Sequence, residues 1–190
     1  EGHRVNPSTP YAVSKAACDL SLISFQKYYG FPAVFTRSAN VYGAGQQLYR
    51  IIPRTIIGIL KGQKLQLHDG GESIRAFIHV QDVAAATFQI MREASPPEIY
   101  HLSTGEHLSI RELVEKIYER MNESFSDFVQ ITSTGEKRDK SYILNCSKVE
   151  KELSWSPKIN LMAGIDDTIK WATDHLSELQ DSSLHYIHKK

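Results

Sequence analysis

The sequence predicts an α/β protein, and two observations support this class. Short runs rich in β-branched and aromatic residues alternate along the chain with longer segments of helical periodicity. Several helical segments also carry end signals, such as a Ser or Thr before the first turn or a glycine after the last. The predicted strands span about 33–37, 65–68, 75–80, 98–102 and 128–132, and the predicted helices about 10–29, 51–60, 82–93, 109–121, 147–153 and 161–179. This order favours an open sheet covered by helices.

Composition narrows the functional classes. The chain has 190 residues, 41% of them hydrophobic and 23% charged, which is typical of a globular domain with one sizeable core or a domain plus a small lobe. The 22 basic residues balance the 22 acidic ones, so no net charge favours nucleic acid or an acidic membrane. No apolar run approaches the roughly 18 residues that span a bilayer, and residues 1–5 lack the apolar core of a signal peptide. We therefore expect a cytoplasmic protein with no nucleic-acid or membrane partner.

The cysteines and histidines indicate neither a disulfide nor a metal site. Cys18 and Cys146 are far apart, and the eight histidines are scattered without ligand spacing. We expect both cysteines to be buried as small apolar side chains, and we assign no metal.

The first predicted helix begins with a tyrosine–lysine pair. Thr9 fits an N-cap, and Gly30 fits the end of the helix. Tyr11 and Lys15 lie one turn apart on one face, where an ammonium lowers the pKa of a phenol. Such a tyrosine accepts the proton of a hydroxyl group that is being oxidised. The alternative is an exposed aromatic beside a solvated lysine, and the Y-x-x-x-K spacing alone does not decide between them.

The same helix carries two apolar stripes. One consists of Val13, Ala16, Ala17, Leu20 and Ile23, and the other of Cys18, Leu22, Phe25 and Tyr29. A helix that is apolar on two sides is typically buried on two sides. The second stripe fits a partner subunit and another part of the same subunit equally well.

Six segments, taken together, resemble one enzyme family. They are P-Y-A-V-S-K at 10–15, R-S-A-N-V-Y-G at 37–43, I-I-P at 51–53, S-I-R-A-F-I-H-V-Q-D-V at 73–83, Y-H-L-S-T-G at 100–105 and S-K-V-E-K-E-L-S-W-S-P at 147–157. In this order and spacing, the chain resembles the extended short-chain dehydrogenase/reductases, within them the NAD-dependent epimerases and dehydratases of nucleotide sugars. The dTDP-glucose 4,6-dehydratases are the nearest group. UDP-sugar 4-epimerases and UDP-glucuronate decarboxylases are the enzymatic alternatives.

The resemblance implies roles for residues that touch the cofactor. Tyr11 would take the proton of the sugar 4-hydroxyl while C4 passes a hydride to NAD, which is preferred over NADP. Lys15 would hydrogen-bond the nicotinamide ribose and keep Tyr11 acidic. Arg37 and Ser38, at the end of a predicted strand, would also lie at the cofactor.

The resemblance also implies substrate contacts. Asn40 lies in a predicted loop over 38–45 and matches a residue that contacts the phosphates of the nucleotide sugar. Arg75 matches an arginine that grips the diphosphate, a task suited to its bidentate donors. In the polar loop at 133–140 the match weakens: Arg138 fits a phosphate contact only after a shift of register, and Asp139 fits its family position better.

The family's glycine-rich pyrophosphate-binding turn is not found in these 190 residues. The resemblance therefore implies the C-terminal part of a doubly wound Rossmann-type sheet plus the small substrate-binding lobe, with the N-terminal strands missing. Residues 1–45 and parts of 76–105 would belong to the NAD-binding domain, 46–75 and 106–180 to the substrate lobe, and 181–190 to a tail. We expect the helix at 10–29 to lack its main packing surface.

The parent protein is expected to be a homodimer acting on a nucleotide sugar. The non-enzymatic alternative for this chain is a sugar-nucleotide-binding or dimerisation fragment without turnover.

Overall fold

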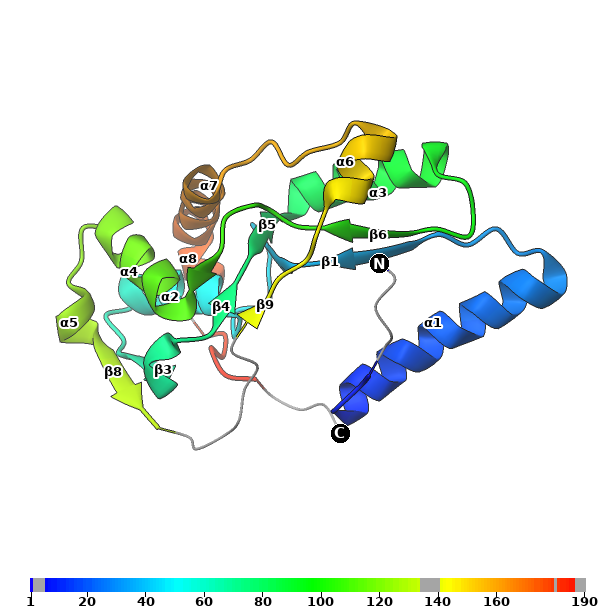
Figure 1. Cartoon of the computed structure of the whole chain (residues 1–190). Helices are drawn as coiled ribbons and strands as arrows, with labels where there is room; N and C mark the ends of the chain where they lie inside the picture. Colours follow the sequence, from blue (N-terminus) through cyan, green and yellow to red (C-terminus); the bar gives the residue numbers. More distant parts are fainter. Residues whose placement is uncertain (2–5, 134–140, 180, 187–190) are drawn as a thin grey trace.

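The structure is a computed structural model that describes residues 1, 6–133, 141–179 and 181–186, and it confirms the α/β class (Figure 1). The helices are α1 Pro10–Tyr29, α2 Ile51–Leu60, α3 Val80–Glu93, α4 Ile110–Arg120, α5 Phe125–Phe128, α6 Ser147–Leu153, α7 Leu161–Asp174 and α8 Leu176–Leu179, with a 3₁₀ turn at Asp69–Gly71. The strands are β1 Phe35–Ser38, β2 Asn40–Tyr42, β3 Leu65–His68, β4 Ile74–Arg75, β5 Phe77–His79, β6 Ile99–Leu102, β7 Leu108–Ser109, β8 Val129–Thr132 and β9 Ser141–Tyr142.

Parallel pairing organises the central strands. β1 pairs with β6, and β2 pairs with β5. The chain changes neighbour at Ala39, whose N–H donates to Leu102 O at 2.8 Å, while the next N–H, of Asn40, donates to Ala76 O at 3.2 Å. The prediction of a loop throughout 38–45 was therefore wrong over β2, because Tyr42 is buried and the backbone finds a second partner strand.

Two further sets of strands lie beside these two pairs. β3 runs parallel to β8, and β4 lies between β7 and β9, antiparallel to the first and parallel to the second. These pairs join segments that are far apart in the sequence, so each one depends on the tertiary fold.

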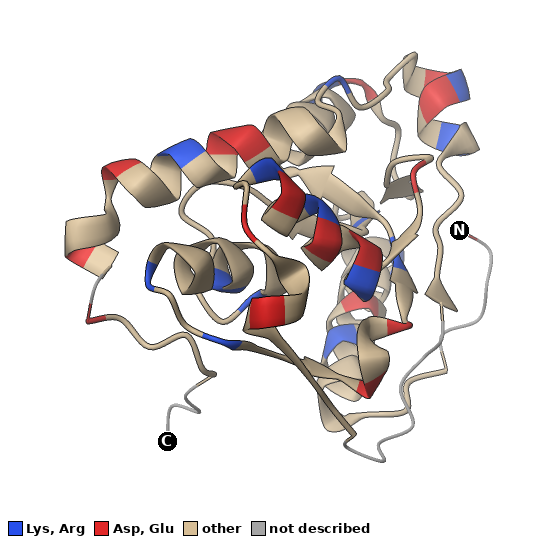
Figure 2. Cartoon of the chain, turned by 90° about the vertical axis from the view of Figure 1, so that its left-hand side faces the viewer, with Lys and Arg blue, Asp and Glu red and all other residues tan. Residues whose placement is uncertain are grey.

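The largest hydrophobic core lies among α2, α4 and α7. Ile57 of α2, Leu113 of α4 and Ile165 of α7 are fully buried in it, and Tyr42 and Phe77 reach it from the sheet. Burying each such aliphatic side chain stabilises the fold by about 1.5–3 kcal/mol. The outward faces of these helices carry charges of both signs (Figure 2). The charge of this surface is therefore neither purely positive nor purely negative.

A second core fixes α3 and α6 over the sheet. Ala86 and Ile90 of α3 pack with Val149 of α6 and with Tyr100 and Leu102 of β6. The linker after α6 is held by a buried carboxylate. Asp82 accepts hydrogen bonds from the backbone N–H groups of residues 158 and 159, both at 3.0 Å.

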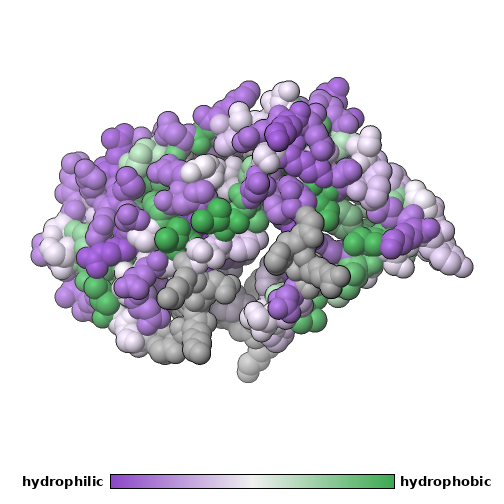
Figure 3. Space-filling model, viewed as in Figure 1, coloured by the Kyte–Doolittle hydropathy of each residue, from purple (hydrophilic) through white to green (hydrophobic). Residues whose placement is uncertain are grey.

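Helix α1 has the predicted ends, and its exposure fits the expectation that it lacks its main packing surface. The Thr9 hydroxyl accepts from the N–H of Ala12 at 3.1 Å, and Gly30 adopts the left-handed conformation, with φ 67°. No side chain of α1 is buried in the described chain. Leu20 is 66% exposed, and hydrophobic side chains reach the surface where α1 extends from the body (Figures 1 and 3). Of the residues in the two apolar stripes, only Ala16 and Ile23 are partly buried.

Two local predictions also need correction. Cys18 is exposed because it lies on α1, and Cys146 is only partly buried, where desolvation raises the pKa of its thiol to about 11. Helix α6 begins at Ser147 as predicted, and the Asn145 side chain accepts the Ser147 N–H at 2.9 Å. The last predicted helix is interrupted at His175, between α7 and α8. Within the described ranges, no helix has the length and apolarity needed to cross a membrane.

Candidate active site

Two adjoining pockets lie beside the ends of β2 and β4. We call the first the Tyr11 pocket, with a volume of about 840 Å³. The second, the His68 pocket, has a volume of about 690 Å³. Both are lined by Tyr49, Ile51, Arg75 and Ile110. The shared walls make them two halves of one cleft.

The Tyr11 pocket gathers four of the residues that the sequence singled out. They are Tyr11 from α1, Ser38 from β1, Asn40 from β2 and Arg75 from β4. Tyr11 lies in the first turn of α1 with 74% of its surface exposed, and Lys15 is exposed one turn further along. Lys15 does not line the pocket. The phenol therefore borders an open cavity in which a ligand hydroxyl has room to approach.

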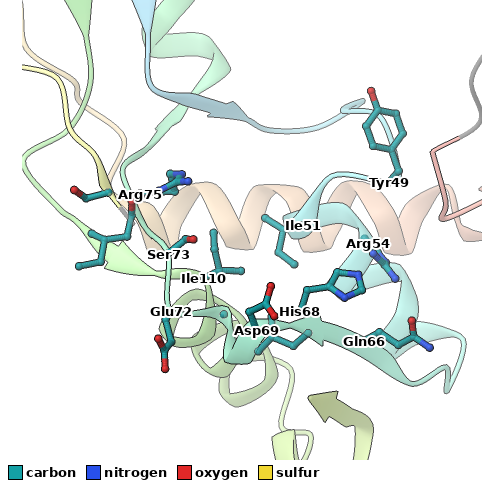
Figure 4. A pocket seen from close by; sticks show the side chains of 14 residues that line it. Tyr49, Ile51, Arg54, Gln66, His68, Asp69, Glu72, Ser73, Arg75 and Ile110 are labelled. Carbon is teal, nitrogen blue, oxygen red and sulfur yellow. Dashed lines mark hydrogen bonds between the residues drawn. The ribbon is translucent and has the colours of Figure 1, made fainter. Parts of the chain in front are cut away.

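Strand pairing places Asn40 near Arg75. The Asn40 N–H and side-chain amide both donate to Ala76 O, at 3.2 and 3.3 Å. Ala76 follows Arg75 directly, so the β2–β5 register brings the two polar side chains to the same end of the sheet. The Arg75 guanidinium donates to Ile74 O at 2.7 Å. Figure 4 shows Arg75 and Ser73 on one side of the His68 pocket, across from Tyr49 and Arg54.

Arg37 lies outside both pockets. Its guanidinium donates to the Asp19 carboxylate at 2.9 Å, with both side chains about one-third exposed or less. This ion pair ties α1 to β1, and so helps to hold Tyr11 near the strands. Arg138 and Asp139 lie outside the described residues.

The sequence reasoning missed several lining residues between β2 and α2. Gln46 donates from its side chain to Val41 O at 2.7 Å, which fixes the loop against β2. The Arg50 guanidinium lies 5.3 Å from the centre of the Tyr49 ring. Arg54, one turn into α2, lines the His68 pocket. The available signal was the run of polar residues directly after the glycines of 43–45.

The cleft has the chemistry of an anion site flanked by a polar pocket. Arg50 and Arg75 both line the Tyr11 pocket, and arginine binds phosphate through paired donors. In the His68 pocket, the Nδ1 atom of His68 lies 2.8 Å from the Thr132 hydroxyl. Tyr49 and Ile110 add apolar surface there, while Gln66 and Asp69 add polar groups. This mixture suits a flat heterocycle with polar edges.

The chain is also similar to known proteins. A family model described as GDP-mannose 4,6 dehydratase matches residues 1–168. The dTDP-D-glucose 4,6-dehydratase of Homo sapiens is 34% identical over 170 residues, covering 87% of this chain and 48% of that protein. The dTDP-glucose 4,6-dehydratase of Haemophilus influenzae is 29% identical over 176 residues, covering 87% of this chain and 52% of that protein. The chain spans about half the length of the curated relatives it matches.

Solved structures agree. The dTDP-glucose 4,6-dehydratase DesIV of Streptomyces venezuelae, with NAD and TYD bound, has a TM-score of 0.89 and 28% identity, covering 94% of this chain and 55% of that one. The UDP-glucose 4-epimerase of Thermotoga maritima, with UDP-glucose, has a TM-score of 0.77 and 25% identity, covering 90% of this chain and 55% of that one. The resemblance drawn from the six sequence segments and the Rossmann-type fold it implied are confirmed. The chain belongs to the GDP-mannose 4,6-dehydratase family of nucleotide-sugar enzymes.

Proposed function

We propose that this chain is part of an NAD-dependent nucleotide-sugar 4,6-dehydratase that works through transient oxidation at C4 of the sugar. The observation that carries the proposal is the meeting of Tyr11, Asn40 and Arg75 around one pocket, although they come from three separate elements. A proton acceptor then lies at one end of a cleft whose middle is cationic. A nucleotide sugar has the matching order of a sugar hydroxyl, a diphosphate and a base.

In this proposal the chain's own residues handle the proton and the phosphates. Tyr11 accepts the proton of the 4-hydroxyl, and Lys15 lies one turn along α1 on the same face. NAD, when bound, would accept the hydride from C4 and later deliver it to C6, so that the product keeps its 4-keto group. Lys15 and Ser38 would hold the nicotinamide end of NAD. The oxidation makes the neighbouring C5 proton acidic, which permits elimination of water from C5 and C6.

The two halves of the cleft receive the two ends of the substrate. The sugar lies in the Tyr11 pocket beside Asn40. Arg50 and Arg75 bind the diphosphate, and Arg138 and Asp139 remain proposed additions to this set. The base enters the His68 pocket. Residues 1–45 with parts of 76–105 then serve the cofactor, and residues 46–75 with 106–180 serve the substrate.

The exposed stripe Cys18, Leu22, Phe25 and Tyr29 supports a further part of the proposal, a homodimer formed through α1. Its competitor is coverage of α1 by another part of the same subunit. Light scattering after size-exclusion chromatography of the full-length gene product separates the two: a monomer would contradict the dimer.

An activity assay tests the function. The full-length gene product, supplied with NAD, is offered dTDP-glucose, UDP-glucose and GDP-mannose, and the 4-keto-6-deoxy product is measured. Tyr11→Phe should lower kcat at least a hundredfold, because the proton acceptor is lost. Tyr28→Phe, on the same helix and 82% exposed, is the matched control and should leave kcat unchanged. No 4-keto product from any of the three substrates would contradict the dehydratase.

A C4 epimerase is the second candidate, and the likeness to the Thermotoga maritima epimerase favours it over a decarboxylase. The product decides: a 4-epimer that keeps its 6-hydroxyl identifies an epimerase. For the 190-residue chain alone we expect weak NAD binding. A dissociation constant in the low micromolar range by calorimetry would contradict that expectation.

A further inference from the structure

The C-terminal segment 181–186 follows α2 from its end back to its beginning. At the end of α2, the Lys61 ammonium donates to Leu179 O at 3.0 Å. Beside the middle of α2, Leu184 and His185 line a small cavity together with Arg54 and Gly58. The segment therefore runs against a helix about 15 Å long, in the opposite direction.

This path brings Tyr186 to the mouth of the cleft. Its ring packs edge-on against Tyr49, with ring centres 5.2 Å apart and planes at 75°. Tyr49 lines both the Tyr11 pocket and the His68 pocket. The contact therefore joins the C-terminal segment to the one aromatic residue that both halves of the cleft share.

The segment has its own anchors. Leu184 packs against the main core of α2, α4 and α7. The Ser183 hydroxyl accepts from the N–H of His185 at 3.1 Å, which turns the chain before Tyr186. A short segment with a half-buried apolar anchor and a local turn presents Tyr186 in a defined place.

Tyr49 is in turn part of a loop that supplies cleft residues. Its hydroxyl donates to the Gln47 side chain, and the Arg50 guanidinium lies over its ring. The loop has few internal backbone hydrogen bonds. The Gln46 N–H donates to Gly43 O at 3.3 Å, and the Arg50 N–H donates to Gln47 O at 3.0 Å. Side-chain contacts from outside the loop therefore matter for its conformation.

We propose that residues 181–186 form a strap that holds the loop 43–50 in its ligand-binding conformation, with Tyr186 as a positioning residue that acts through Tyr49. The strap sets Arg50 at the phosphate position and keeps Tyr49 at the boundary of the two pockets. An edge-on aromatic pair contributes enough interaction free energy to shift the balance between the conformations of such a loop. The choice of phosphate and base as ligands rests on the proposed function, whereas the strap itself does not.

The first test needs no ligand. Hydrogen–deuterium exchange is measured on the full-length gene product and on its Tyr186→Ala and Tyr186→Phe variants. Tyr186→Ala should speed exchange of the amides of 44–50 about fivefold, while Tyr186→Phe, which keeps the ring, should match the wild type. Unchanged exchange in Tyr186→Ala would overturn the strap. Equal acceleration in both variants would also overturn it, because the ring contact would then not carry the effect.

The second test reads out binding. Titration calorimetry with dTDP, UDP and GDP identifies the diphosphate that the wild type binds. Tyr186→Ala should raise its dissociation constant about fivefold and Tyr186→Phe should leave it near the wild-type value, with the melting temperature unchanged in both. Tyr28→Ala, at an exposed tyrosine of α1, is the control. An unchanged constant in Tyr186→Ala overturns the positioning role. If no diphosphate binds the wild type, the proposed function fails and hydrogen exchange still decides the strap.

Discussion

Helices α1 and α2 differ in packing, although the sequence predicted both with nearly correct boundaries. Six of the ten residues of α2 are buried, whereas none of the twenty residues of α1 is. Composition explains only part of the difference, because α1 also carries large apolar side chains, such as Leu20 and Phe25, that are more than half exposed. The rest comes from the neighbouring elements: α4 and α7 cover α2, whereas α1 buries no side chain and meets β1 through the Asp19–Arg37 ion pair. A helix's own sequence sets its ends and its apolar faces, and the neighbouring elements determine their burial.

The largest effect should come from truncating a core side chain in each helix. In the 190-residue chain, Ile57→Ala should lower the free energy of unfolding by about 2–5 kcal/mol, because it leaves a cavity among α2, α4 and α7. Leu20→Ala should change it by less than about 0.5 kcal/mol, because this side chain is exposed. Urea titration checks both values. A loss in Leu20→Ala as large as that in Ile57→Ala would show that α1 is packed.

The next effect concerns the close approach of α7 to the sheet. A Cβ at Gly164 would lie 2.2 Å from the Tyr42 hydroxyl oxygen, which donates to Leu161 O at 3.1 Å. Gly164→Ala should therefore lower stability by about 1–3 kcal/mol, despite the better helix propensity of alanine. Gly105→Ala, where a Cβ meets nothing within 4 Å, is the matched control and should be neutral. Equal melting temperatures of the two variants would mean that Tyr42 moves aside freely.

Two helix caps extend the comparison at a smaller scale. In α4, the Ser109 hydroxyl accepts the N–H of Glu112 at 3.1 Å, and the Glu112 carboxylate accepts the N–H of Ser109 at 2.7 Å. Ser109→Ala should lower the free energy of unfolding by about 1 kcal/mol. Thr9→Ala removes a similar bond from α1 but should leave global unfolding unchanged and only speed hydrogen exchange in the first turn of α1. A global loss in Thr9→Ala would show that α1 contributes to the stability of the whole fold.

The smallest effect is the pH dependence of the link between α4 and α7. Arg120 donates twice to Asp166, at 2.5 and 2.6 Å, and this hydrogen bonding lowers the pKa of the Asp166 carboxyl below its ordinary value of 3.8. A lowered pKa means that the stabilisation is complete above the ordinary value and is lost as the pH falls through the lowered one. The stability gap between wild type and Asp166→Asn, from urea titrations, should be constant from pH 7 to pH 5 and shrink below about pH 4. A gap that grows on acidification would contradict the assignment.

Some features followed from the sequence alone because their causes are local. The N-cap Thr9 and the end of α1 at Gly30 each depend on residues within one helical turn. Tyr11, Ser38, Asn40 and Arg75 were also named from motifs, and they line one pocket. The sequence therefore determined the helix ends, the α/β class and several of the residues that line the Tyr11 pocket.

Only the tertiary structure decided how these parts meet. The parallel pairing of β2 with β5 places Asn40 near Arg75, and it turns part of a predicted loop into a strand. Asp19 holds Arg37 away from both pockets, and Tyr186 reaches Tyr49 across the whole length of α2. The physical reason is the same in each case. Hydrogen bonds and packing between distant segments depend on geometry that no local sequence pattern contains, so strand partners, burial and the cleft appear only in the folded chain.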